Sequence, residues 1–281
     1  MAWGREQVAW GADVWAALDA AVHDEFHRSA VALKFIPFFG PVDNAMTVPA
    51  DVVDLDTMTI DESAVVALVE LGVEFGLTRQ QTAAEAPDQT GVALATRAAN
   101  LLAQAEDRVI FVGDAAFKDP LFKRVQRRSG DAGPGLLRAA EQVVSVSPVA
   151  DDPKRYMDNT FNAVVEGCSL LQQQGQNGPY ALALRSEDYA DTLASPPSSL
   201  VMPADRIRPL VPLGMFGTGM LPPSSGVLVS VGGNTMDLVV GMEPTTEFVQ
   251  VSTEGLYRFR VFERFALRVK DQSAIVRLDF T

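Results

Sequence analysis

The sequence is poor in the residues from which most active sites are built. Among 281 residues it has one cysteine, Cys168, and two histidines, His23 and His27. A single thiol cannot form an intrachain disulfide, which fits a reducing cytoplasm, and its apolar neighbours indicate a small buried side chain. No stretch reaches the roughly 18 apolar residues of a membrane-spanning helix, and the start of the chain lacks a signal sequence. The sequence therefore predicts a cytoplasmic globular protein.

Basic residues are also few. The chain has 23 Lys and Arg against 36 Asp and Glu, for a formal net charge of -13. Such a surface repels nucleic acid phosphates, and the densest basic run, at 123–128, is short. We interpret that run as a solvated face or a subunit contact. Neither nucleic acid nor a membrane is expected as a partner.

The sequence lacks the complete patterns that hold metals, nucleophiles or phosphates. His23 and His27 stand four residues apart, but there is no third histidine, and Asp24 stands where a metalloprotease helix has its glutamate. No Gly-x-Ser-x-Gly elbow occurs. The glycine-rich run 214–219 lacks the preceding strand and following helix that phosphate binding requires. We therefore expect no catalytic residues, no metal and no cofactor, and favour a structural role.

Apolar periodicity predicts a mixed α+β fold without internal repeats. Apolar residues recur every three or four positions in three segments, which predicts helices at 3–32, 89–112 and 159–174. Alternating or continuous apolar runs predict strands at 180–185, 227–231, 236–240, 257–269 and 274–280. In the strand at 257–269 one face is apolar and the other basic. Residues 115–158 show no clear pattern.

Residues 46–78 look extended and suggest an arm. They are rich in Val, Thr and Asp, and two strands joined around Asp61 and Glu62 would make a long hairpin. A hairpin alone is marginal in water, so this one is expected to lie on a partner subunit. The apolar residues that we expect between subunits are Val65, Val66, Leu68, Val69 and Leu71.

Four segments together resemble the family 1 encapsulins, which share the tailed-phage major capsid fold. They are residues 105–111 (Ala-Glu-Asp-Arg-Val-Ile-Phe) followed by Gly113, the run Gly178-Pro179-Tyr180, residues 232–238 before Gly241, and residues 261–269. In the family these look like the end of the spine helix, the strand that opens the axial domain, the hairpin by which the chain leaves it, and the long C-terminal strand. The early helix with Trp15, then Phe35 and Gly40-Pro41, also fits.

The resemblance implies a domain organisation and a function. The peripheral domain would combine residues 1–45, 79–147 and 241–281, with an extended loop at 46–78 and an axial domain at 148–240. The chain would be a shell subunit that self-assembles with copies of itself into an icosahedral nanocompartment. The shell would encapsulate a cargo enzyme through a terminal targeting peptide. The usual family cargo is a ferritin-like protein, which implies iron storage, or a dye-decolourising peroxidase.

The resemblance also implies two sites. A pore loop near the five-fold axis would comprise Ser195, Pro196, Pro197, Ser198 and Ser199. A groove for the cargo peptide would be formed by Phe26, Leu33, Phe35 and Ile36, with Glu243, Pro244 and Thr246 opposite. For each of these residues the alternative is core packing under the first helix. Gln80 stands where some members carry a tryptophan beside a flavin, so no flavin is expected.

Two other functions compete with an encapsulin shell. A phage major capsid protein has the same fold but packages DNA, so the contents of the particle separate the two. A soluble enzyme of unknown type would form a low-order oligomer with a deep pocket and perturbed titrating groups.

Overall fold

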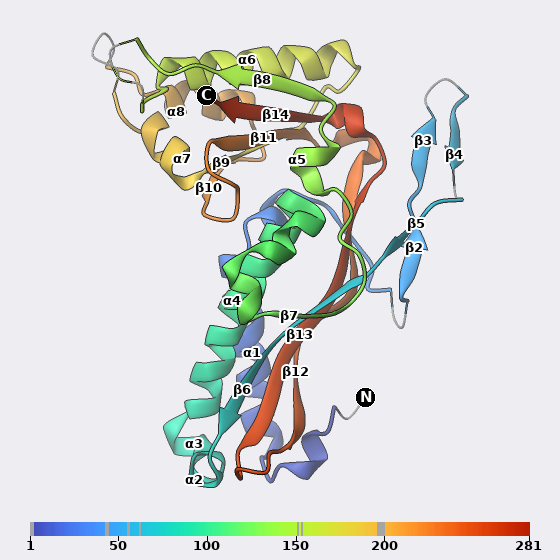
Figure 1. Cartoon of the computed structure of the whole chain (residues 1–281), viewed down its shortest axis with the longest axis vertical. Helices are drawn as coiled ribbons and strands as arrows, with labels where there is room; N and C mark the ends of the chain where they lie inside the picture. Colours follow the sequence, from blue (N-terminus) through green and yellow to red (C-terminus); the bar gives the residue numbers. More distant parts are fainter. Residues whose placement is uncertain are drawn as a thin grey trace.

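The computed structural model describes residues 3–42, 45–54, 57–61, 63–150, 152, 154–195 and 200–281. They form an elongated molecule of helices and strands, with a slender arm that projects from its side (Figure 1). Two of the sheets have five strands each. We call the one that contains the longest strands the main sheet, and the other one the second sheet. Within the described ranges, no helix is long and apolar enough to cross a membrane.

The main sheet is built on a long antiparallel ribbon. In the order β1-β12-β13-β6-β7, its strands are β1 (Phe38–Phe39), β12 (Met236–Val251), β13 (Tyr257–Val269), β6 (Val69–Leu77) and β7 (Gln126–Ser129). The ribbon consists of β12 and β13, which pair along most of their length. The prediction for 257–269 is confirmed, whereas β12 is far longer than the predicted strand at 236–240.

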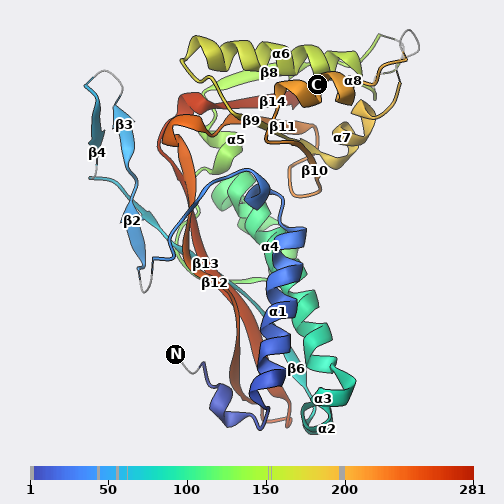
Figure 2. The ribbon, with the colours of Figure 1, turned by 180° about the vertical axis from the view of Figure 1, so that it is seen from behind.

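Two amphipathic helices pack side by side against the main sheet (Figure 2). They are α1 (Ala12–Ser29) and α4 (Thr90–Val112). Apolar residues at spacings of three and four make their buried stripes, and Ala and Leu give α4 high helix propensity. α4 ends at Gly113, whose φ of 67° suits glycine; a Cβ there would lie 2.2 Å from the Gly133 carbonyl oxygen. The helix predicted at 3–32 is shorter in the structure, because residues 5–7 form only the 3-10 turn η1 (Arg5–Gln7).

The second sheet contains strands from distant parts of the chain. In the order β10-β9-β11-β14-β8, these are β10 (Met215–Thr218), β9 (Tyr180–Arg185), β11 (Ser225–Ser230), β14 (Ile275–Phe280) and β8 (Gln142–Val146). Its helices are α5 (Gly135–Ala139), α6 (Asp158–Gln173), α7 (Ser186–Thr192) and α8 (Pro203–Ile207). The sequence-based division assigns β8 and β14 to the peripheral domain, but in the structure they pair with each other in the second sheet. The predicted boundaries between 147 and 148 and at 241–281 therefore do not follow the sheets. The turn η6 (Gly232–Asn234) likewise joins the two sheets rather than two strands of one hairpin.

The arm consists of two short ribbons in series. β2 (Thr47–Pro49) pairs with β5 (Val65–Ala67), and β3 (Val52–Asp54) pairs with β4 (Thr59–Asp61). The turn therefore lies between Asp54 and Thr59 and not around Asp61 and Glu62. The Asp54 carboxylate accepts the Thr57 backbone N–H, and Met58 has a φ of 51°, as such a turn requires. Glu62 lies outside the described residues.

The arm is shorter than the predicted loop at 46–78. β6 belongs to the main sheet and pairs with β13, so the projecting part ends before Val69. Short elements complete the chain, namely η2 (Ala32–Lys34), α2 (Arg79–Ala83), α3 (Glu85–Asp88), η3 (Gly113–Lys118), η4 (Pro120–Lys123), η5 (Arg208–Leu210) and η7 (Gln272–Ala274).

Candidate functional site

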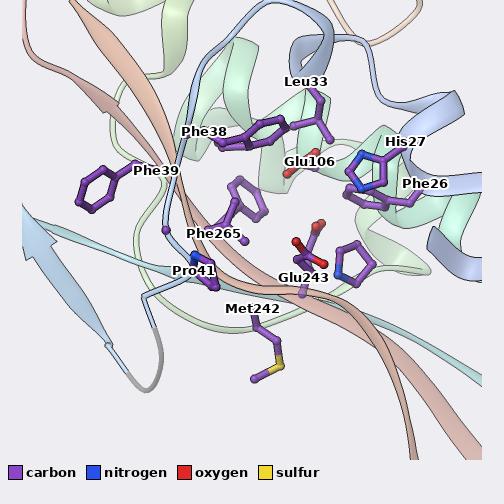
Figure 3. A pocket seen from close by; sticks show the side chains of 15 residues that line it. Phe26, His27, Leu33, Phe38, Phe39, Pro41, Glu106, Met242, Glu243 and Phe265 are labelled. Carbon is purple, nitrogen blue, oxygen red and sulfur yellow. The ribbon is translucent and has the colours of Figure 1, made fainter. Parts of the chain in front are cut away.

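An apolar pocket of about 190 Å³ lies between α1, β1 and the ribbon of β12 and β13 (Figure 3). Phe26 and His27 come from α1, and Phe38 comes from β1. Its lining also includes Leu33, Phe39, Gly40, Pro41, Glu106, Leu238, Val240, Met242, Glu243, Pro244, Glu263 and Phe265. Most of these side chains are apolar, as in sites that hold small apolar groups.

The pairing of β1 with β12 positions the two phenylalanines of β1. The strands run parallel, with Phe38 opposite Leu238 and Phe39 opposite Val239. Phe38 is 53% exposed and Phe39 is 47% exposed, although both are large and apolar. The chain then turns away at Gly40, where φ is 122° and a Cβ would lie 2.6 Å from the Val240 carbonyl oxygen. Exposed aromatic side chains beside a pocket are typical of a docking surface.

The structure brings four of the seven predicted groove residues to this pocket. Phe26, Leu33, Glu243 and Pro244 line it. Their function as peptide-binding residues stays a prediction.

The other three predicted groove residues lie in the core. Phe35 is buried and stacks on Phe216 at 5.6 Å between ring centroids, and Ile36 is also buried. Thr246 is fully buried, and a register shift between Met242 and Thr245 breaks the alternation of β12 just before it. For these three residues, core packing is therefore the better interpretation.

Sequence reasoning missed Phe38, Phe39 and Met242 as pocket residues. The run Phe35 to Phe39 was visible as one apolar stretch, but periodicity could not separate its buried half from its exposed half. The signal that was available is the Gly40-Pro41 break directly after two aromatics, because a chain that turns there leaves them at a surface.

Two of the polar residues in the pocket lining are buried glutamates. Glu106 comes from α4 and Glu263 from β13, and each is 2% exposed. Among the residues that the structure describes, Glu106 Oε2 and Glu263 Oε1 have no hydrogen-bond partner. Burial raises the pKa of both carboxyl groups well above the ordinary value, and the charge of Glu106 raises the pKa of Glu263 further.

The neighbouring Asp107 fixes the segment that leads from α1 to the pocket. Its carboxylate accepts the backbone N–H groups of Val31 and Ala32, each at 2.8 Å. Burial is the strongest influence and raises the pKa of Asp107 to about 7, although these hydrogen bonds and the charge of Lys34 act against the rise. On the opposite wall, burial and the neighbouring His23 lower the pKa of His27.

The two histidines lie close together on α1. Their ring centroids lie 4.2 Å apart. Among the described residues, no group of three or more His, Cys, Asp or Glu side chains is arranged to hold a metal ion. Gln80 lies exposed on α2.

The arm carries a second candidate surface. Four of its large apolar side chains are between 43 and 79% exposed, namely Val52, Met58, Ile60 and Val65. Of the predicted contact residues, Val65 is exposed and Val66 half-buried, whereas Leu68, Val69 and Leu71 are buried within the chain itself. Those last three cannot meet a neighbour, because β6 places Val69 and Leu71 in the main sheet and Leu68 packs beneath the base of the arm. The apolar residues that remain available for contact with a neighbouring subunit therefore lie nearer the tip of the arm than we predicted.

The predicted pore loop lies almost wholly outside the described residues. Ser195 is described and exposed, while Pro196, Pro197, Ser198 and Ser199 are not described. Directly after them, Leu200, Val201 and Met202 are exposed.

Comparison with known proteins identifies the family. The sequence model of the family described as "Encapsulating protein for peroxidase" matches residues 2–266. The type 1 encapsulin shell protein EncA of Myxococcus xanthus (strain DK1622) is 30% identical and covers 94% of this chain and 92% of that protein. The diheme-cytochrome-encapsulin shell fusion protein of Kuenenia stuttgartiensis is 24% identical over 94% of this chain and 72% of its own length.

Solved structures agree on the fold. The virus-like particle from Pyrococcus furiosus superposes with a TM-score of 0.68 at 16% identity, over 94% of this chain and 99% of that one. The capsid of Myoviridae phage XM1 superposes with a TM-score of 0.58 at 12% identity, over 88% of this chain and 90% of that one. The predicted tailed-phage capsid fold is thus confirmed, and the chain belongs to the encapsulin family of shell proteins.

Proposed function

We propose that the chain assembles with copies of itself into a closed icosahedral shell in the cytoplasm, and that its arm makes a principal contact between subunits. The supporting observation is the exposed apolar surface of the arm. Full burial of an exposed Val, Ile or Met side chain stabilises by about 1.5–3 kcal/mol. Because Val52, Met58, Ile60 and Val65 are only partly exposed, their remaining exposed surface offers about 4–7 kcal/mol in total. Part of this is offset by ordering on association.

Charged substitutions at the tip of the arm test this contact. Met58→Asp with Ile60→Asp should give a folded subunit that forms no closed particles, because charges cannot be buried unpaired in an interface. Met58→Leu with Ile60→Val is the matched control and should assemble normally. Gel filtration and electron microscopy measure assembly, and circular dichroism checks the fold. Normal particles from the Asp variant would show that the arm is not the contact.

We further propose that the pocket beneath Phe38 docks a terminal peptide of a cargo protein on the inner wall of the shell. The supporting observation is the pair of half-exposed aromatic rings beside an apolar pocket. Aromatic residues in such positions act as anchors for extended peptides. The chain itself would then have a structural role, and the chemistry would belong to the cargo, such as a ferritin-like protein or a peroxidase.

Mass spectrometry of purified particles tests this role. Wild-type shells from the native host should contain protein cargo and no DNA genome, whereas DNA inside would indicate a phage-type capsid. Phe38→Ala shells should assemble but carry less cargo, and Val249→Ala removes an exposed apolar side chain away from the pocket as a control. Equal cargo in the Phe38→Ala and wild-type shells would remove the pocket from the proposal.

A further inference from the structure

The pocket contains an unmet demand for hydrogen bonds. Glu106 and Glu263 line it, both are 2% exposed, and each has a carboxylate oxygen that finds no partner in the described part of the chain. An unsatisfied buried polar group destabilises the protein, and more so when it is charged. Figure 3 shows the Glu106 carboxylate among the rings and apolar side chains of the pocket. A ligand that satisfies these oxygens would remove this destabilisation.

The charges around the two carboxyl groups are mostly negative. Glu243 of β12 also lines the pocket, and Asp107 acts on both glutamates from α4. Among the fifteen lining residues the one basic side chain is His27 of α1, and its lowered pKa leaves it neutral at pH 7. Lys34 acts on Asp107 and does not line the pocket. Within the described ranges, the lining of the pocket therefore lacks a cation that would balance its carboxyl groups.

We propose that Glu106 and Glu263 form a subsite for one basic side chain, lysine or arginine, of the docked cargo peptide. This inference rests on the proposed docking function of the same pocket. The alkyl stem of such a side chain can lie along Leu33, Phe38 and Phe265, while its cationic end reaches the two carboxylates. Charge complementarity selects this occupant over a wholly apolar one, which would leave both carboxyl groups unpaired.

Protons compete with the cation for this subsite. In the empty pocket, burial favours protonated carboxyl groups, whereas a bound cation favours the ionised forms. Binding therefore releases protons, and the affinity for a cation rises with pH until the carboxyl groups of the empty pocket are ionised. His27 contributes a trend of the same sign, because it becomes cationic at low pH.

Saturation-transfer NMR on assembled wild-type shells tests the subsite with n-hexylammonium as the probe and 1-hexanol as its neutral counterpart. We expect n-hexylammonium to bind at least tenfold more tightly than 1-hexanol at pH 8, and at least tenfold more tightly at pH 8 than at pH 5. The pH trend should persist in His27→Gln shells. Equal affinity for both probes, or a pH trend that disappears in His27→Gln shells, would overturn the proposal.

Isosteric substitution gives a second measurement. Glu106→Gln with Glu263→Gln should remove the preference for n-hexylammonium over 1-hexanol; an undiminished preference would overturn the subsite. If this variant fails to assemble, the pH dependence of n-hexylammonium binding to wild-type and His27→Gln shells tests the subsite without it.

The cargo content of the Phe38→Ala shells separates this inference from the docking function. Undiminished cargo there overturns docking, and the peptide subsite with it. Lost cargo together with no preference for n-hexylammonium in wild-type shells overturns the cation subsite alone.

Discussion

Arg268 joins the arm to the main sheet, and its two carboxylate partners can be removed one at a time. Its side chain is 3% exposed and donates two hydrogen bonds to Asp237, at 2.9 and 2.8 Å. The same guanidinium pairs with Asp51 at the base of the arm, and with the Pro49 carbonyl oxygen at 3.2 Å. Asp237 also holds Lys270 at 2.7 Å. Asp237 therefore balances two buried cations, whereas Asp51 supplements one.

The two substitutions should differ in magnitude. Asp237→Ala leaves Arg268 and Lys270 buried with too little negative charge, which costs about 3–5 kcal/mol. Asp51 is partly exposed, and Asp51→Ala leaves the pair of Arg268 with Asp237 intact. A hydrogen bond between charged groups contributes about 1.5–3 kcal/mol, and partial exposure reduces this to about 1 kcal/mol.

The outcome for assembly should be the reverse of that for folding. Urea unfolding followed by tryptophan fluorescence, at one protein concentration, should place Asp237→Ala well below wild type and Asp51→Ala close to it. Asp51→Ala should nevertheless close fewer shells in electron microscopy, because the arm loses the contact that directs it. Equal destabilisation by both variants, or a wild-type yield of shells from Asp51→Ala, would refute this view of the anchor.

Three further predictions concern single side chains. Phe35→Ala should lower the free energy of unfolding by about 3–5 kcal/mol, because Phe35 is core, while Phe38→Ala should leave the urea midpoint near that of wild type. Burial raises the pKa of Cys168 to about 11, so iodoacetamide at pH 8 should label it slowly in the native protein and rapidly in urea; fast native labelling would contradict its burial. Because burial raises the pKa of Asp107 to about 7, its contribution to stability is complete below about pH 4 and is lost as the pH rises through 7. The unfolding midpoint of wild type should therefore fall relative to that of Asp107→Asn between pH 4 and pH 8, and a constant difference would argue against a raised pKa.

Local periodicity predicted the elements whose burial follows one simple repeat. The helix predicted at 89–112 and the strand predicted at 257–269 agree with α4 and β13 to within one residue at each end. The strand was expected to have one buried face and one basic face, yet Arg260 and Arg268 of the basic face are buried as well. Arg260 pairs with Glu70 at 3.0 Å and Glu247 at 2.8 Å, from the strands on either side. An alternation of period two shows that the strand has two faces. It does not show that acidic side chains on the neighbouring strands allow the basic face to be buried too.

Long-range pairing was beyond the sequence pattern. Glu106 and Glu263 meet because α4 packs on β13, and no local spacing relates two residues so far apart. β14 was recognised as a strand, but its parallel partner β8 lies in a segment that showed no clear pattern. Phe38 and Phe39 reach the surface through parallel pairing with β12, which depends on a strand of only two residues. Each of these features is set by tertiary contacts rather than by local propensity.

The pocket and the arm both contact the side chain of Arg268. Phe39 lines the pocket, and its ring lies over the guanidinium of Arg268 at 4.7 Å from the centroid. The same guanidinium holds Asp51 of the arm. A peptide that displaces Phe39 would change the packing of Arg268, and an arm pulled by a neighbouring subunit would act on the same side chain. Coupling between two sites is reciprocal, so any factor by which fixing the arm changes the affinity of the pocket equals the factor by which a docked peptide changes the affinity of the arm for its neighbour.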